Sequence, residues 1–197
     1  MKYLILCIIC INFIFSQETD STDAIQFQEE LNKNFSDSLS SPLLKEDLQQ
    51  FKGLDFFPVS EKFIVEARFV KLKKEKTFKM KTTTKRAPKY KKYGTLYFSI
   101  DDKEFQLNVY QNLELTQKKG YEDYLFLPFT DTTNGKETYI GGRYLDFKIP
   151  KDTKVIVNFN KAYNPYCAYN YNYSCPIVPM ENDLSIAVEA GVKKFHD

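Results

Sequence analysis

The 197-residue sequence has a single histidine, His196, near its C-terminus, and only seven glycines. With one histidine, the sequence argues against most reactions that need an imidazole base and against histidine-rich metal sites. None of the glycines stands in a G-x-G-x-x-G or G-x-x-x-x-G-K-[ST] arrangement, which argues against the common nucleotide-binding loops. We therefore predict neither a cofactor nor a metal site.

The sequence also lacks an excess of one charge. It contains 28 Lys and Arg against 26 Asp and Glu, which gives a net charge of +2. This balance excludes a globally basic nucleic-acid-binding protein and an acidic disordered tail. Hydrophobic residues make up 43% of the chain and aromatic residues 16%, which is enough for the core of one domain.

A hydrophobic run over residues 3–15 is too short for a membrane span, which needs about 20 residues. The run follows Lys2 and precedes the small residue Ser16. A positive start, an apolar run and a small residue, in this order, are typical of a secretory signal peptide. We predict cleavage after Ser16 and a mature chain without a transmembrane helix; a buried helix of the mature protein is the alternative.

Export to the periplasm, the cell envelope or the extracellular space follows from this prediction. Lipid anchoring at Cys7 or Cys10 is not favoured, because a bulky residue precedes each of them. Cleavage leaves two cysteines, Cys167 and Cys175, and in an oxidising compartment a disulfide between them is the first expectation. Two reduced, buried thiols are the main alternative, and metal or redox chemistry is the third. A zinc site needs about four N or S ligands, which two thiols and one distant histidine do not supply.

The hydrophobic pattern changes from helical to β along the chain. Apolar residues at i, i+4 and i+8 predict a helix over 21–37, and a second, short helix is predicted at 42–51 with Ser41 as its N-cap. From Phe63 onward the period is two, which predicts strands at 63–70, 96–100, 105–109, 123–129, 137–140, 143–149, 154–159 and 184–190.

Turn signals join these strands at Asp101-Asp102-Lys103 and at Asn134-Gly135. No long helical pattern separates the strands, so parallel βαβ units are not expected. The prediction is a mainly β chain: a signal peptide over 1–16, a helical arm and linker over 17–62, and an antiparallel barrel or sandwich over 63–197.

Basic residues are concentrated between residues 71 and 92, where eleven Lys or Arg stand against one acid, Glu75. Contact with an anionic membrane surface or glycan is the functional interpretation. A solvated β-ribbon or loop, whose lysines protect a sheet edge, is the interpretation that we favour.

Polar residues gather in the C-terminal third. Arg143 follows Gly141-Gly142, a pair that lets another group approach the backbone closely. Its guanidinium can clamp a carboxylate or a phosphate. We predict that a small polar or anionic ligand, or an envelope component, binds near Arg143, at a site drawn from Asp131, Tyr139, Arg143, Asn158, Tyr163, Asn164, Glu181 and Asn182.

Other interpretations of these residues stay open. A hydrolase-like enzyme without histidine would use Asp131 or Glu181 in a pair of carboxylates with separated pKa values, so whether the protein is an enzyme is undecided. An internal network would instead pair Arg143 with Asp131, Asp146 or Glu181. A structural module would bind its partner through the basic segment. The five tyrosines between 163 and 173 either stack on a sugar or another flat ligand, or pack inward.

Four motifs carry a resemblance to a known family. They read GLxFFP over 53–58, LFLPFxDxTxGxETYxGGRYLD over 125–146, FNxAYNPxCAY over 159–169 and CPxxPxEN over 175–182. Their order is similar to that in the bacterial and archaeal proteins named domain of unknown function 1684, and the resemblance covers residues 27–192. The family implies no established activity, so it assigns no catalytic residue to this chain.

Overall fold

The computed structural model describes the backbone of residues 3–196 and the side chains of residues 20–196. The predicted signal peptide, residues 1–16, lies outside the residues whose side chains are described. Helix α1 (Tyr3–Ser36) begins the described chain. Within the described residues, no helix combines the length and the apolar character needed to cross a membrane.

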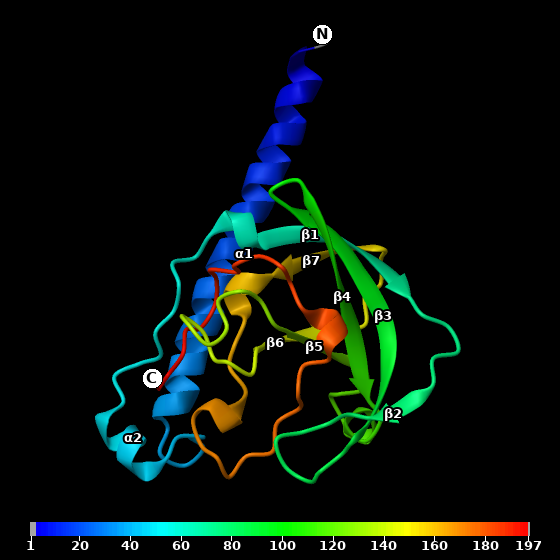
Figure 1. The fold of residues 1–197 in the computed structure, drawn as a ribbon. Coiled ribbons are helices and arrows are strands. Elements are labelled where there is room, and N and C mark those ends of the chain that lie inside the picture. The colour runs from blue at the N-terminus through cyan, green and yellow to red at the C-terminus, as the bar shows by residue number, and fades with distance from the viewer. Residues whose placement is uncertain (1–2, 197) are drawn as a thin grey trace.

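Seven strands of the described chain form one antiparallel sheet that curves into a half barrel (Figure 1). The order along the sheet is β6-β5-β4-β3-β1-β7, and β2 pairs with β3 beside this path. The predicted class, mainly β and antiparallel with an N-terminal helical arm, is confirmed. The strands are β1 (Ile64–Lys71), β2 (Thr77–Lys79), β3 (Lys89–Ile100), β4 (Lys103–Asn112), β5 (Tyr124–Phe129), β6 (Arg143–Lys148) and β7 (Lys154–Asn158).

Short helical segments join and flank the strands. Helix α2 (Lys45–Gln50) follows α1, and single 3₁₀ turns lie between or after the strands. These turns are η1 (Glu61–Phe63), η2 (Leu115–Gln117), η3 (Phe159–Lys161), η4 (Tyr166–Ala168) and η5 (Met180–Asn182).

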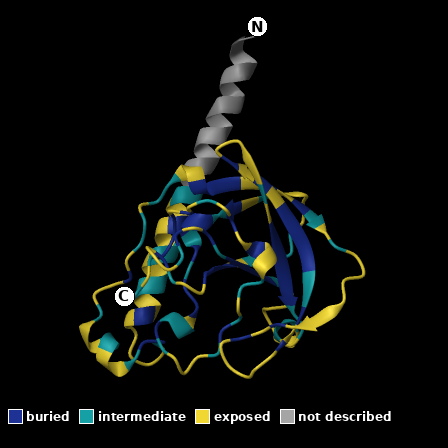
Figure 2. Ribbon diagram, viewed as in Figure 1, coloured by how far each residue is buried: buried dark blue, intermediate teal, exposed yellow. Residues whose placement is uncertain are grey.

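Alternating burial explains the strands that the sequence predicts correctly. The apolar positions of β1, β3 and β4 meet in one core, and Figure 2 shows these strands largely buried. Asp101 and Asp102 join β3 to β4 at φ 50° and 58°, the left-handed conformation that a tight two-residue hairpin turn requires. The predicted hairpin is therefore confirmed, with Lys103 already in β4.

Helix α1 is fixed to the β7 side of the sheet by polar contacts as well as by packing. Asn158 Nδ2 donates to the carbonyl of Asp20 at 2.8 Å, and Gln28 Nε2 donates to the carbonyl of Asn160 at 3.0 Å. The predicted helix over 21–37 lies within this element at its C-terminal end, to within one residue, but α1 begins much earlier, at Tyr3. Its contacts place the helical arm directly against the β part of the chain.

The second helix is shorter than predicted and Ser41 does not cap it. The Ser41 hydroxyl donates to the Phe35 carbonyl at 2.6 Å and accepts from the Leu43 N–H at 3.2 Å. The side chain is therefore occupied in the turn that follows α1. Helix α2 begins only at Lys45, without a side-chain hydrogen bond at its N-cap.

The predicted strand at 137–140 is wrong. These residues lie in the loop between β5 and β6, where the Thr138 N–H donates to the Thr133 carbonyl at 3.2 Å. The Asn134 side chain donates to the Thr138 hydroxyl at 2.8 Å. Local backbone and side-chain bonds within the loop thus replace strand pairing, and the Asn-Gly turn lies inside this loop rather than between two strands.

The predicted strand at 184–190 is also wrong, although its alternation is real. Leu184, Val188 and Ala190 are buried in the core as the pattern predicts. The carbonyls of Val188 and Ala190, however, accept hydrogen bonds from the Arg143 side chain rather than from a neighbouring strand. Alternation reports burial on one side of an extended chain; it does not report what pairs with the backbone.

Most of the basic segment, residues 71–92, is exposed, although Met80, Thr82 and Tyr90 within it are buried. All three residues of β2 are exposed, and β2 pairs antiparallel with the start of β3. This geometry agrees with the solvated-ribbon interpretation of its lysines.

Gly142 provides a test of the close backbone contact beside β6. Its φ is +87°, and an added Cβ would lie 2.6 Å from the carbonyl oxygen of Phe129. We expect Gly142→Ala to lower the free energy of unfolding by about 2–5 kcal/mol, because it combines left-handed strain with a clash against backbone. Urea denaturation measures the loss.

Gly120→Ala is the matched control. Its φ is +88°, but a Cβ there would meet no atom within 4 Å. Only the strain remains, so the expected loss is about 1–2 kcal/mol. Equal losses in the two variants would contradict the close approach at Gly142.

Candidate functional site

Arg143, the centre of the predicted site, is buried and bonded within the protein. Its side chain and that of Asp131 are both 0% exposed, and Arg143 Nη2 lies 2.8 Å from Asp131 Oδ2. The guanidinium also donates to the carbonyls of Val188, at 2.7 Å, and Ala190. Burial lowers the pKa of Arg143, and the negative charge of Asp131 opposes that change. The internal-network interpretation describes this residue, whose guanidinium is enclosed rather than open to a ligand.

Asp131 is surrounded by hydrogen-bond donors. Besides Arg143, its Oδ1 accepts from the Thr133 N–H at 2.9 Å, the Thr133 hydroxyl at 2.6 Å and the Val188 N–H at 3.2 Å. These hydrogen bonds fix the carboxylate in one position inside the protein. Its geometry suits a structural role better than proton transfer.

Asn182 is a second buried structural group among the predicted site residues. Its Oδ1 accepts from the Asn108 N–H at 2.9 Å, and its Nδ2 donates to the carbonyls of Asn108, at 2.9 Å, and Pro128, at 2.6 Å. Asn108 belongs to β4 and Pro128 to β5. The Asn182 amide therefore bridges two strands.

Glu181 and Asn164 also have partners inside the protein. Glu181 accepts from the Tyr110 hydroxyl at 2.6 Å and from Lys92 Nζ at 2.8 Å. Partial burial opposes ionisation, but these two hydrogen bonds lower the pKa of Glu181. Asn164, which is buried, donates to the carbonyl of Lys193 at 2.9 Å.

A cleft of about 650 Å³ lies away from Arg143, between α1, strands β5 and β6, and the loop that carries Cys175. Its volume is in the range of small-molecule sites, about 300–1,000 Å³. Of the eight predicted site residues, Tyr163 alone lines it. Seven tyrosines line what we name the tyrosine cleft: Tyr90, Tyr121, Tyr124, Tyr144, Tyr163, Tyr166 and Tyr173.

Asp146 is an exposed carboxylate in the wall of the tyrosine cleft. The hydroxyls of Tyr124 and Tyr163 donate to its Oδ1 at 2.7 and 2.6 Å. Burial and the Asp146 charge raise the pKa of both tyrosines, so their hydroxyls stay protonated and keep donating. Because both bonds end on Oδ1, the other oxygen of this exposed residue can accept a hydrogen bond from a ligand.

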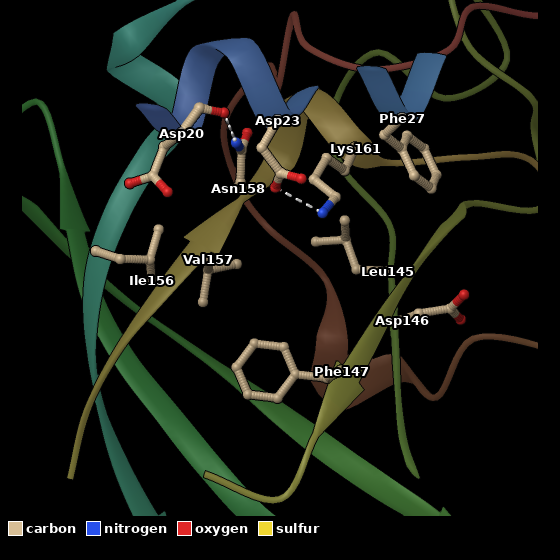
Figure 3. Close-up of a pocket in the computed structure, with 10 residues that line it drawn as sticks. All are labelled: Asp20, Asp23, Phe27, Leu145, Asp146, Phe147, Ile156, Val157, Asn158 and Lys161. Atoms are coloured by element: carbon tan, nitrogen blue, oxygen red, sulfur yellow. Dashed lines mark hydrogen bonds and ion pairs between the residues drawn. The ribbon is translucent and has the colours of Figure 1, made fainter. Parts of the chain in front are cut away.

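A second hollow, of about 380 Å³, adjoins the tyrosine cleft between β6, β7 and α1 (Figure 3). Phe27 and Asp146 line both spaces. Asn158, another predicted site residue, lines this hollow but uses its side chain to hold the α1 backbone. The remaining predicted residue, Tyr139, lies apart from both, against Cys167.

The second hollow contains two carboxylates from α1. Burial and the nearby Asp23 raise the pKa of Asp20, and Asp23 pairs with Lys161 at 2.8 Å. In Figure 3 the Asp20 carboxylate points toward Ile156, whereas that of Asp23 points toward Lys161. The two groups do not face each other as the acid and base of a hydrolase would.

Both C-terminal cysteines are free thiols in this structure, so the predicted disulfide is not formed there. The Cys167 N–H donates to Cys175 Sγ at 3.1 Å, and the Tyr139 hydroxyl lies 3.9 Å from Cys167 Sγ. Hydrogen bonding with the Cys175 thiol lowers the pKa of Cys167 to about 7. The same contact raises the pKa of Cys175.

Sequence reasoning missed most of the tyrosine cleft. Its aromatic residues stand at the alternate positions that the core pattern leaves on the outer side of the sheet. Tyr124 and Phe126 flank the core residue Leu125 on β5, and Tyr144 and Asp146 flank Leu145 on β6. Aromatic residues on both sides of one strand were the available signal for a second packed or binding surface.

The buried ion pair between Asp131 and Arg143 is expected to affect stability far more than an exposed ion pair does. Asp131→Ala is expected to lower the free energy of unfolding by about 3–5 kcal/mol, because it leaves the Arg143 charge buried without a partner. Glu66→Ala removes the exposed pair with Lys154, whose side chains are 59% and 75% exposed, and should change stability by less than about 1 kcal/mol. Urea unfolding distinguishes them, and similar losses would argue against a buried charge.

Known proteins similar to the chain share its fold and leave its function open. The solution NMR structure of an uncharacterised protein from Haloarcula marismortui is 30% identical, with a TM-score of 0.71, and the match covers 90% of this chain and 96% of that one. No protein with a curated description matches. The model of the family described as "Protein of unknown function (DUF1684)" matches residues 49–193, most of the chain. The chain therefore belongs to the DUF1684 family.

Proposed function

We propose that the protein is exported and binds a small polar ligand with a ring, such as a sugar, in the tyrosine cleft rather than beside Arg143. The observation that carries this proposal is the exposed Asp146 carboxylate, which two tyrosine hydroxyls hold in place within an aromatic wall. A concave, aromatic surface with a few fixed polar groups is the usual form of a small-molecule site.

Exposed aromatic rings supply the stacking surface. Tyr121, Tyr166 and Tyr173 are 45%, 47% and 36% exposed, although each lines the cleft. The rings of Tyr166 and Tyr173 meet edge to face at 5.1 Å, which limits their freedom to move. A tyrosine offers an apolar face and a hydroxyl at the same time, and a sugar ring offers the matching C–H face and hydroxyls.

Charged groups of both signs surround these rings. Asp146 and Glu114 can accept hydrogen bonds, whereas Arg86 and Lys118 can donate them, and all four line the cleft. Arg86 Nη2 is held by the Ser174 carbonyl at 3.1 Å. A ligand with several hydroxyl groups can use both kinds of partner, whereas a hydrocarbon would leave them without hydrogen bonds.

The hydrolase alternative finds less support among the described residues. Asp131 is enclosed with Arg143, and Glu181 is ionised beside Lys92 with a lowered pKa. A carboxylic acid that donates a proton needs a raised pKa instead. Binding therefore stands ahead of hydrolysis.

A panel of mono- and oligosaccharides, screened against the purified mature protein by native mass spectrometry, tests the binding proposal. We expect a one-to-one complex with at least one sugar. Tyr166→Ala should weaken that complex about tenfold, or about 1.4 kcal/mol, because it removes an exposed stacking ring.

Tyr171→Ala is the matched control for this experiment. Tyr171 belongs to the same loop and is 79% exposed, but it is not among the residues that line the cleft. Its removal should leave the affinity unchanged. A panel in which no sugar binds, or an equal loss in both variants, would overturn the proposal.

Export is supported by the order of charge, apolar run and small residue in the first sixteen residues. Bacterial cells that express the full chain are expected to release a mature protein that begins at Gln17. N-terminal sequencing of the exported fraction checks the cleavage site. Recovery of only the uncleaved chain, inside the cells, would contradict export.

A further inference from the structure

We propose that Cys167 and Cys175 form a redox-active dithiol that exchanges with low-molecular-weight disulfides. This reaction goes beyond ligand binding in the tyrosine cleft and does not depend on it. The inference starts from two free thiols that the fold brings together and from the different surroundings of each.

The two cysteines lie at opposite ends of a short loop that returns on itself. The 3₁₀ turn η4 places the Cys167 N–H 3.1 Å from Cys175 Sγ. The Cys175 side chain also lines the tyrosine cleft. Because the sulfur atom of one residue touches the backbone of the other, a disulfide can form with little movement of the chain.

The structure gives the two thiols different access to solvent. Cys175 is buried, with 6% of its surface exposed, whereas Cys167 is only partly buried. The more exposed Cys167 can therefore react first with a reagent from solvent, and the buried Cys175 can react second. This is the usual division between an attacking cysteine and a resolving cysteine.

The surroundings of Cys167 favour its thiolate. The Cys175 thiol and the Tyr139 hydroxyl both hydrogen-bond to its sulfur, and the first of these contacts lowers the pKa of Cys167 to about 7. The thiolate is the nucleophile in disulfide exchange, so this lowered pKa favours reaction at Cys167.

Backbone and side-chain groups of residues 81–83 hold Cys175 in place. The Cys175 N–H donates to the Thr83 hydroxyl at 3.1 Å, and its carbonyl accepts from the Thr83 N–H at 2.9 Å. The next segment continues this pairing, since the Ile177 N–H donates to the Lys81 carbonyl at 2.9 Å. These bonds fix the backbone that carries Cys175.

The exchange takes place in two balanced steps. The Cys167 thiolate attacks one sulfur of a disulfide R–S–S–R; a Cys167–S–S–R bond forms, the R–S–S–R bond breaks, and R–S⁻ leaves and takes up a proton. Cys175 then loses its proton and attacks the Cys167 sulfur, which closes the protein disulfide and releases the second R–S⁻, which is protonated in turn. Two protein thiols are oxidised and one R–S–S–R is reduced to two R–SH.

A reversible couple differs from a structural disulfide in how easily it opens. Contacts that stabilise the Cys167 thiolate stabilise the reduced form, and this makes the disulfide easier to reduce. A structural disulfide would resist glutathione and would open only with a stronger reductant.

The purified full chain, treated first with oxidised and then with an excess of reduced glutathione, tests the proposal. Alkylation followed by peptide mass spectrometry reads the state of Cys167 and Cys175 separately from that of Cys7 and Cys10. We expect oxidised glutathione to convert them to a disulfide and reduced glutathione to restore them. Thiols that do not react with oxidised glutathione, or a disulfide that only dithiothreitol opens, would overturn the proposal.

Two single variants identify the roles of the sulfur atoms. Cys175→Ser should accumulate a glutathione adduct on Cys167, because the resolving thiol is missing. Cys167→Ser should accumulate at least about tenfold less adduct, because the remaining thiol is buried. Equal adducts would contradict the assignment. If one variant fails to fold, the glutathione experiment on the wild-type protein still tests the proposal. A failure of sugar binding would not affect it, because the thiol exchange does not depend on the cleft.

Discussion

The buried ion pair between Arg143 and Asp131 is the constraint on which the rest of the structure depends. Two charges removed from water are tolerated only where further hydrogen bonds stabilise them. Here further partners come from the backbone of residues 184–190: the Val188 and Ala190 carbonyls accept from Arg143, and the Val188 N–H donates to Asp131. The same requirement fixes the loop between β5 and β6, because Thr133 donates to the Asp131 carboxylate from within that loop.

The tyrosine cleft lies on the outer side of the same strands that carry the ion pair's surroundings. Strands β5 and β6 direct one set of side chains to the core and the other set outward, where Tyr124, Tyr144 and Asp146 lie. The walls are completed by α1 and by the loop of residues 163–176. The hydroxyl of Tyr144 donates to the carbonyl of Pro176, so the loop is tied to the sheet beneath it. A rigid sheet that positions loops is the common arrangement for binding sites, and it also holds the two cysteines together.

The sequence predicts the parts of the fold that depend on local pattern. Period-two burial identifies β1 and the β3–β4 hairpin, and the glycines before Arg143 correctly indicate a close backbone approach at Gly142. The same reasoning fails at 137–140 and at 184–190, where hydrogen bonds with loop backbone and with side chains take the place of a strand ladder. It also misplaces the site, because a polar residue looks the same in sequence whether it faces a ligand or a buried partner. The partners of Arg143 lie up to 47 residues away in the chain, and the cleft combines segments from α1 to Pro176. Neither arrangement is encoded in a short stretch of residues.

Native-state hydrogen exchange of the Val188 and Thr133 amides measures most directly whether the buried pair holds the fold together. Both amides donate to the Asp131 carboxylate. If the pair is the central constraint, they should exchange only through global unfolding, with the same opening free energy as core amides of β4 such as Leu107. Exchange of these two amides through a low-energy local opening, while β4 stays protected, would contradict that role.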